Sequence, residues 1–137
     1  EADRFVTAFY GVLDINARRI TYVNAGHNPG LLYRAATDQF ESLDSTGPLL
    51  GTLETATFKE RHAEIRPGDL LVLYTDGITE SMSAEEELFG EDRLKDVIRA
   101  RRAGTAAEIV RGIRETVGAF SGGEPEDDLT VVVLKGK

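Results

Sequence analysis

The sequence contains no cysteine, and its basic residues are outnumbered by acidic ones. Without cysteine, neither a disulfide nor a thiolate metal site can form, so a metal would have to bind oxygen or histidine ligands. The 16 basic and 24 acidic residues give a net charge of -8. This charge repels phosphate backbones, so we expect no nucleic-acid partner and a soluble cytoplasmic protein.

Long apolar runs are also missing from the sequence. The longest, at residues 70–74, is far shorter than the roughly 20 residues of a membrane helix, and no signal peptide opens the chain. We therefore expect no membrane partner. The chain has 137 residues, of which 41% are hydrophobic, so it is long enough to bury one core without disulfides.

Short runs of apolar, β-branched and aromatic residues dominate the first part of the chain. Residues 5–13 and 19–24 enclose a turn-prone Asp-Ile-Asn-Ala segment, which predicts a β-hairpin. Residues 30–33 and 40–43 enclose a polar stretch and predict a second hairpin.

Two further strands are expected between residues 57 and 74. Alternation over residues 57–65 predicts a strand at an edge or half-exposed, with His62 in solvent. A Pro-Gly turn follows, and we expect Asp69 to stabilise it. Residues 70–74 do not alternate, which predicts a central strand covered by protein on both faces.

Capping signals predict the helices. Ser83 and Glu86 have capping-box spacing, which predicts a short helix that Gly90 can end. Apolar residues then continue at helical spacing until Gly104.

A second capping box is formed by Thr105 and Glu108. The helix that it begins has an apolar stripe that should pack on the sheet, made of Ile109, Ile113, Val117 and Phe120. A flexible loop and a last strand at residues 129–134 follow. Several strands with two or three helices, and no βαβ alternation, predict an α+β fold of antiparallel layers.

Acidic residues border the central strand and the last strand. Asp76 and Gly77 come just after residues 70–74, so we expect the strand to fix the carboxylate and Gly77 to let the backbone turn away sharply. Asp127 and Asp128 precede the last strand. If the two strands are antiparallel neighbours, the end of one lies beside the start of the other.

Facing carboxylates repel each other unless a cation lies between them, and oxygen-rich sites suit Mg²⁺, Mn²⁺ or Ca²⁺. Two simpler interpretations stay open: an ordinary turn at Asp76, and a solvated acidic loop at Asp127 and Asp128. His27 is either an acid, base or ligand, or a loop histidine bonded to the backbone. The sequence contains no phosphate-binding glycine loop, nucleophile elbow, zinc helix motif or EF-hand loop.

Six segments carry a family resemblance when they are taken in order. They are Phe-Val-Thr-Ala-Phe-Tyr-Gly-Val-Leu-Asp at 5–14, Tyr-Val-Asn-Ala-Gly-His-Asn-Pro at 22–29, Gly-Pro-Leu-Leu-Gly at 47–51, Pro-Gly-Asp at 67–69, Leu-Tyr-Thr-Asp-Gly-Ile-Thr-Glu at 73–80 and Asp-Asp-Leu-Thr at 127–130. In this order they resemble the SpoIIE and RsbU branch of the metal-dependent, protein phosphatase 2C-like serine/threonine phosphatases. The resemblance implies part of an α-β-β-α sandwich, with two antiparallel sheets flanked by helices.

The resemblance also implies a site and a reaction. Asp76 and Asp127 would bind a dinuclear Mn²⁺ or Mg²⁺ centre, and Asp128 would be a further ligand or would orient its neighbour. No catalytic side chain beyond the ligands is implied. The reaction would be hydrolysis of phosphoserine or phosphothreonine on a regulatory protein of a bacterial sigma-factor or stress-signalling pathway.

One departure from the family pattern limits this expectation. The Gly-Gly-Asp and Asp-Val-Ser-Gly-like segments of the family's N-terminal half, which supply further metal ligands, are missing here. We therefore interpret residues 1–137 as the C-terminal portion of a single phosphatase domain, inactive by itself. Its uncovered apolar sheet surface would favour self-association or a partner. The alternative is a non-catalytic protein-interaction domain, a pseudophosphatase.

Overall fold

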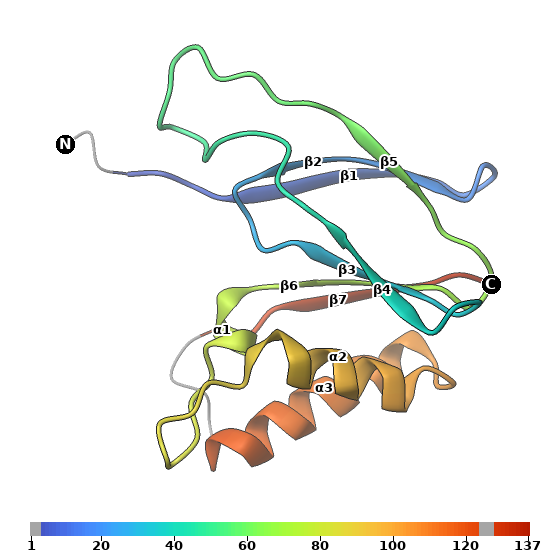
Figure 1. Ribbon diagram of the computed structural model, residues 1–137, viewed down its shortest axis with the longest axis vertical. Coiled ribbons are helices and arrows are strands. Elements are labelled where there is room, and N and C mark those ends of the chain that lie inside the picture. Colours follow the sequence, from blue (N-terminus) through green and yellow to red (C-terminus); the bar gives the residue numbers. More distant parts are fainter. Residues whose placement is uncertain (1–3, 124–127) are drawn as a thin grey trace.

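The fold consists of two antiparallel β-sheets stacked on each other, with helices against the outer face of one sheet (Figure 1). The computed structural model describes residues 4–123 and 128–137. The three-stranded sheet has the order β1-β2-β5, with strands β1 (Ala8–Asp14), β2 (Arg19–Ala25) and β5 (Arg61–Glu64). The four-stranded sheet has the order β4-β3-β6-β7, with strands β3 (Gly30–Arg34), β4 (Gln39–Leu43), β6 (Leu70–Tyr74) and β7 (Val131–Lys135).

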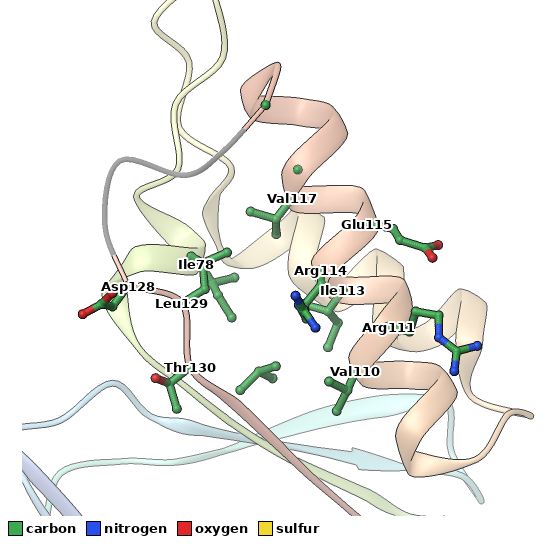
Figure 2. A pocket seen from close by; sticks show the side chains of 13 residues that line it. Ile78, Val110, Arg111, Ile113, Arg114, Glu115, Val117, Asp128, Leu129 and Thr130 are labelled. Atoms are coloured by element: carbon green, nitrogen blue, oxygen red, sulfur yellow. The ribbon is translucent and has the colours of Figure 1, made fainter.

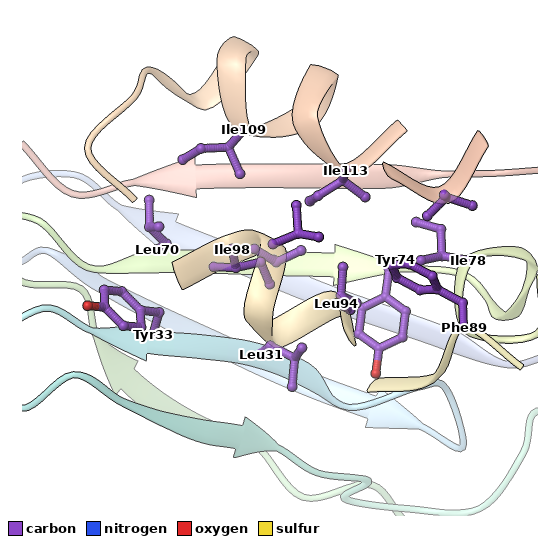
Figure 3. Close-up of a cluster of buried hydrophobic side chains, with 13 residues drawn as sticks. Leu31, Tyr33, Leu70, Tyr74, Ile78, Phe89, Leu94, Ile98, Ile109 and Ile113 are labelled. Atoms are coloured by element: carbon purple, nitrogen blue, oxygen red, sulfur yellow. The ribbon is translucent and has the colours of Figure 1, made fainter. Parts of the chain in front are cut away.

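The helices lie on the four-stranded sheet. They are α1 (Asp76–Thr79), α2 (Gly90–Arg101) and α3 (Ala106–Ser121). Figure 3 shows their apolar side chains between the helices and the strands, among them Leu94, Ile98, Ile109 and Ile113. Within the described ranges, no helix is both long enough and apolar enough to cross a membrane.

A second apolar core lies between the two sheets. Its buried members are Ile20, Tyr22, Leu32, Leu43, Ile65 and Leu71. Phe9 stacks on Tyr22 with ring centroids 5.3 Å apart. Because Leu71 faces this core while Leu70 faces the helices, both faces of β6 are covered. The predictions of a central strand, of an α+β class and of two antiparallel sheets with helices outside are confirmed.

The two predicted hairpins are confirmed, and the expected edge strand is shorter than predicted. β1 pairs with β2, and β3 pairs with β4. β5 covers residues 61–64 instead of 57–65, because these four residues pair with Arg19 to Tyr22 of β2, whereas the N–H of Lys59 donates to the carbonyl of Thr46. β5 does lie at a sheet edge, and His62 is exposed as predicted.

Asp69 stabilises its turn as predicted, and it also joins neighbouring elements. Its buried carboxylate accepts hydrogen bonds from the backbone N–H of Arg66 and of Ala35, each at 3.0 Å. Arg34 completes the set with an ion pair at 2.8 Å. The buried charge is thus fully paired, which is the condition under which a buried carboxylate is tolerated.

The prediction of a helix that begins at Ser83 is wrong. Glu86 has φ +62°, a left-handed conformation that cannot lie in the first turn of a right-handed helix. The Ser83 hydroxyl instead accepts hydrogen bonds from the N–H of Glu85 and of Glu87, as in a turn. Gly90 begins α2 and does not end an earlier helix.

The capping box of Thr105 and Glu108 is confirmed. The Thr105 hydroxyl accepts from the N–H of Glu108 at 3.2 Å, and the Glu108 carboxylate accepts from the N–H of Thr105 at 2.8 Å. α3 ends at Gly122, whose φ of +75° is the left-handed conformation that glycine adopts without strain.

Candidate metal centre

The end of β6 and the start of β7 lie side by side, as predicted for antiparallel neighbours. The last paired residues are Tyr74 and Val131. Just beyond them, the N–H of Thr75 donates to the carbonyl of Thr130 at 3.1 Å, and the N–H of Thr130 donates to the Thr75 hydroxyl at 3.1 Å. Thr75 is the N-cap of α1, but its hydroxyl forms no cap and binds the neighbouring strand.

This pairing places two acidic residues at one edge of the sandwich. Asp76 is the first residue of α1, and its side chain is exposed. Asp128 precedes β7 and is also exposed, with its carboxylate directed away from α3 (Figure 2). The third predicted ligand, Asp127, lies outside the described residues.

Gly77 is needed at this place for a reason other than the one predicted. Its φ is not positive, so glycine is not required for a sharp turn, and α1 simply begins there. A Cβ on Gly77 would instead collide with the carbonyl oxygen of Asp128 and would lie 3.2 Å from Leu129 Cδ2. The missing side chain therefore lets the backbone of α1 contact the backbone before β7.

The oxygen chemistry of the site suits a hard divalent cation, but the described ligands are few. No salt bridge or hydrogen bond among residues 4–123 and 128–137 reaches the Asp76 carboxylate. No three His, Asp or Glu side chains in these ranges lie close enough together to hold a metal. Asp76 and Asp128 therefore fit Mg²⁺ or Mn²⁺ only as part of a ligand set.

Tyr74, next to the site, adds no charge to it at neutral pH. Burial, and then the neighbouring carboxylate of Glu91, raise the pKa of the Tyr74 phenol to about 12. The phenol hydroxyl lies 3.5 Å from that carboxylate. Because the phenol stays protonated, the negative charge beside the end of β6 comes from carboxylates alone.

An open groove of about 910 Å³ borders the site between α3 and the start of β7. Figure 2 shows its apolar wall, made by Ile78, Val110, Ile113, Val117 and Leu129. Arg111 and Arg114 of α3 add positive charge to its lining, and Asp128 lies at one end. The groove therefore borders the backbone before β7, whereas the Asp128 carboxylate points away from it.

His27 is bonded to the backbone, in line with the simpler of its two interpretations. Its Nε2 lies 3.2 Å from the carbonyl of Tyr74, two residues before Asp76. Thr75 and Thr130 were not predicted to have a role, although Thr75 precedes Asp76 and Thr130 lies two residues after Asp128. The short distance in sequence between these hydroxyl residues and the acidic residues could have indicated a role for them near the site.

Comparison with known proteins gives a consistent family. A profile of the Stage II sporulation protein E (SpoIIE) family matches residues 1–137. The chain is 35% identical over 131 residues to Protein IcfG of Synechocystis sp. and 30% identical over 137 residues to phosphoserine phosphatase RsbU of Bacillus subtilis. These matches cover 95% and 100% of the chain but 20% and 41% of the two relatives.

A solved structure supports the same fold. It is the manganese-presoaked phosphatase domain of SpoIIE from Bacillus subtilis, which is similar with a TM-score of 0.74 at 22% identity. The match covers 96% of this chain and 56% of that one. The chain therefore spans only part of each of these three proteins.

Proposed function

The chain belongs to the SpoIIE family, and from this premise we propose that it forms the C-terminal portion of a single metal-dependent protein phosphatase domain. The observation that carries the proposal is the pairing of the end of β6 with the start of β7, which places Asp76 and Asp128 at one edge. We propose Asp76, Asp127 and Asp128 as metal ligands. Mn²⁺ or Mg²⁺ bound there would supply Lewis acidity toward a phosphoryl group.

The residues of this chain would supply charge and position. Asp76 and Asp128 provide the negative oxygen atoms that a hard cation prefers. The two hydrogen bonds between Thr75 and Thr130 keep the segments that carry them together. Substrate access fits the exposure of both carboxylates, since a phosphorylated side chain must reach them from solvent.

We propose a phosphoserine or phosphothreonine residue of a regulatory protein as the substrate, in a sigma-factor or stress-signalling pathway. RsbU of Bacillus subtilis is a phosphoserine phosphatase, and its match covers the whole length of this chain. The site as described has no nucleophilic cysteine that would form a phosphoenzyme, since the sequence contains none.

The rest of the domain would complete both the ligand set and the sheets. β1 and β7 each form an edge of their sheet. Tyr10 and Val12 are 69% and 55% exposed on β1, and Val132 is 47% exposed on β7. Such edges invite further strands. In the isolated chain, self-association would cover the same surface.

The test uses the full-length protein and the substitution Asp76→Asn. We expect Mn²⁺-dependent release of phosphate from a phosphoserine peptide, and a loss of about a hundredfold or more in kcat in the variant, because a neutral amide is a weaker ligand. Asp92→Asn, an exposed carboxylate on α2, is the matched control and should be unaffected. Equal rates for Asp76→Asn and wild type would refute the ligand role, and an inactive wild type would favour the non-catalytic alternative.

A further inference from the structure

His27 connects three segments that lie far apart in the sequence. It lies in the loop between β2 and β3, where the chain crosses from one sheet to the other (Figure 1). Its Nδ1 lies 3.0 Å from the hydroxyl of Thr7, just before β1, and its Nε2 lies 3.2 Å from the carbonyl of Tyr74 at the end of β6. One imidazole thus bridges the two sheets.

The Tyr74 carbonyl determines which ring nitrogen must carry a proton. A carbonyl oxygen only accepts, so Nε2 must carry the proton that is donated to Tyr74. In a neutral imidazole, Nδ1 is then an acceptor, and the hydroxyl of Thr7 can donate to it. The tautomer with its proton on Nε2 therefore satisfies both contacts.

The backbone of His27 is itself held in place. Its N–H donates to Oδ1 of Asn24 at 2.8 Å. Asn24 is completely buried, and its Nδ2 donates to the carbonyl of Leu43 at 3.1 Å. The imidazole therefore projects from a support that is tied into the sheets, and a ring held in this way can fix the atoms that it touches.

The contact falls beyond the point where the pairing of β3 with β6 stops. On one side of β6, the pairing with β3 stops at Val72. On the other side, the pairing with β7 extends to Tyr74, and Thr75 is hydrogen-bonded to Thr130 beyond it. The segment from Tyr74 to Asp76 is thus held against β7 by Thr130 and against the other sheet by His27.

We infer that His27 is a positioning residue, which fixes the Tyr74 carbonyl and thereby the place of Asp76 at the end of β6. The inference rests on the proposed function, because the position of Asp76 matters for metal binding only if Asp76 is a ligand. His27 touches neither metal nor substrate in this scheme. Its effect passes through the backbone of two residues.

The chain offers a matched control for this inference. His62 is the other of the two histidines, and its Nδ1 lies 3.4 Å from the hydroxyl of Thr21. His62 and Thr21 lie on the outer face of the three-stranded sheet, because their sequence neighbours Ala63 and Ile20 face the inner core. This pair repeats the histidine–threonine contact, but within residues 4–123 and 128–137 no hydrogen bond joins either side chain to β6.

The experiment compares His27→Ala, His27→Gln and His62→Ala in the full-length protein. Calorimetric titration measures Mn²⁺ affinity, and hydrogen exchange of the metal-free protein measures protection at residues 75–78. We expect His27→Ala to weaken Mn²⁺ binding by about 10- to 100-fold and to speed exchange there, the range typical of groups that orient a ligand. His27→Gln should restore most of the affinity, because its amide can donate to the Tyr74 carbonyl, and His62→Ala should match wild type.

Two outcomes would overturn the inference. One is unchanged affinity and exchange in His27→Ala, whatever its melting temperature. The other is an equal loss in His62→Ala, which would indicate a general effect of surface substitution. If wild type binds no Mn²⁺, the proposed function fails, and the exchange at residues 75–78 still decides whether His27 holds the end of β6.

Discussion

Replacing Gly77 by alanine adds one methyl group where α1 meets the segment before β7. The new Cβ would lie closer to the Asp128 carbonyl oxygen than the ordinary contact distance by about 1 Å or more, and it would lie 3.1 Å from the carbonyl carbon. Neither atom belongs to a flexible side chain, so the backbone itself must move. Overpacking of this kind costs about 1–3 kcal/mol, against a gain of about 1 kcal/mol from the better helix propensity of alanine. We expect a net loss of up to about 2 kcal/mol.

Gly118→Ala is the control for Gly77→Ala. Gly118 also lies in a helix, and the nearest atom to an added Cβ is the carbonyl oxygen of Gly123, 3.9 Å away. This substitution should raise the free energy of unfolding by up to about 1 kcal/mol. Urea unfolding followed by circular dichroism measures both changes, and Mn²⁺ titration should show weaker binding for Gly77→Ala alone. A Gly77→Ala variant as stable as Gly118→Ala would refute the backbone contact as the reason for glycine.

Two further predictions concern charges. Asp69→Ala should lower the free energy of unfolding by about 3 kcal/mol, because the N–H groups of Arg66 and Ala35 lose their acceptor and Arg34 keeps only its ion pair with the exposed Glu41. The exposed Asp96→Ala should change it little, and a loss below about 1 kcal/mol for Asp69→Ala in urea unfolding would contradict this reasoning. Tyr74→Phe should flatten the loss of stability between pH 10 and about 12, since the unfolded phenol ionises near 10 and the folded one near 12. The raised pKa of Tyr74 contributes on the order of 2 kcal/mol to the free energy of unfolding, and this contribution is fully present below pH 10. If wild type and Tyr74→Phe lose stability equally at alkaline pH, the prediction is refuted.

Local pattern was enough to predict much of the fold. The two hairpins, the covered strand at residues 70–74 and the helix that begins after Thr105 each depend on neighbours in sequence: turn residues, an unbroken apolar run and a capping box. These signals act over a few residues, and tertiary packing agrees with them here. The side-by-side placement of Asp76 and Asp128 followed from one added assumption, that two strands are antiparallel neighbours.

The wrong or incomplete predictions concern features that local pattern does not determine. Ser83 and Glu86 have the spacing of a capping box, but the chain forms a turn in which Met82 pairs with Leu88 instead. β5 begins only at Arg61, because the chain before it bonds to Thr46 and not to β2, although the alternation in sequence covers both parts. His27 touches a carbonyl that is 47 residues away, and no spacing rule reports such a contact.

The candidate centre is held mainly by backbone atoms, and this has a consequence for how it tolerates change. The carbonyl of Thr130, the carbonyl of Tyr74 and the carbonyl of Asp128 are each contacted by a neighbouring segment at the end of β6. Substituting a ligand side chain such as Asp76 removes none of these contacts, so the scaffold should persist while the chemistry is lost. Substituting Gly77 or His27 alters the contacts themselves, so geometry and ligand affinity should change together although every carboxylate remains.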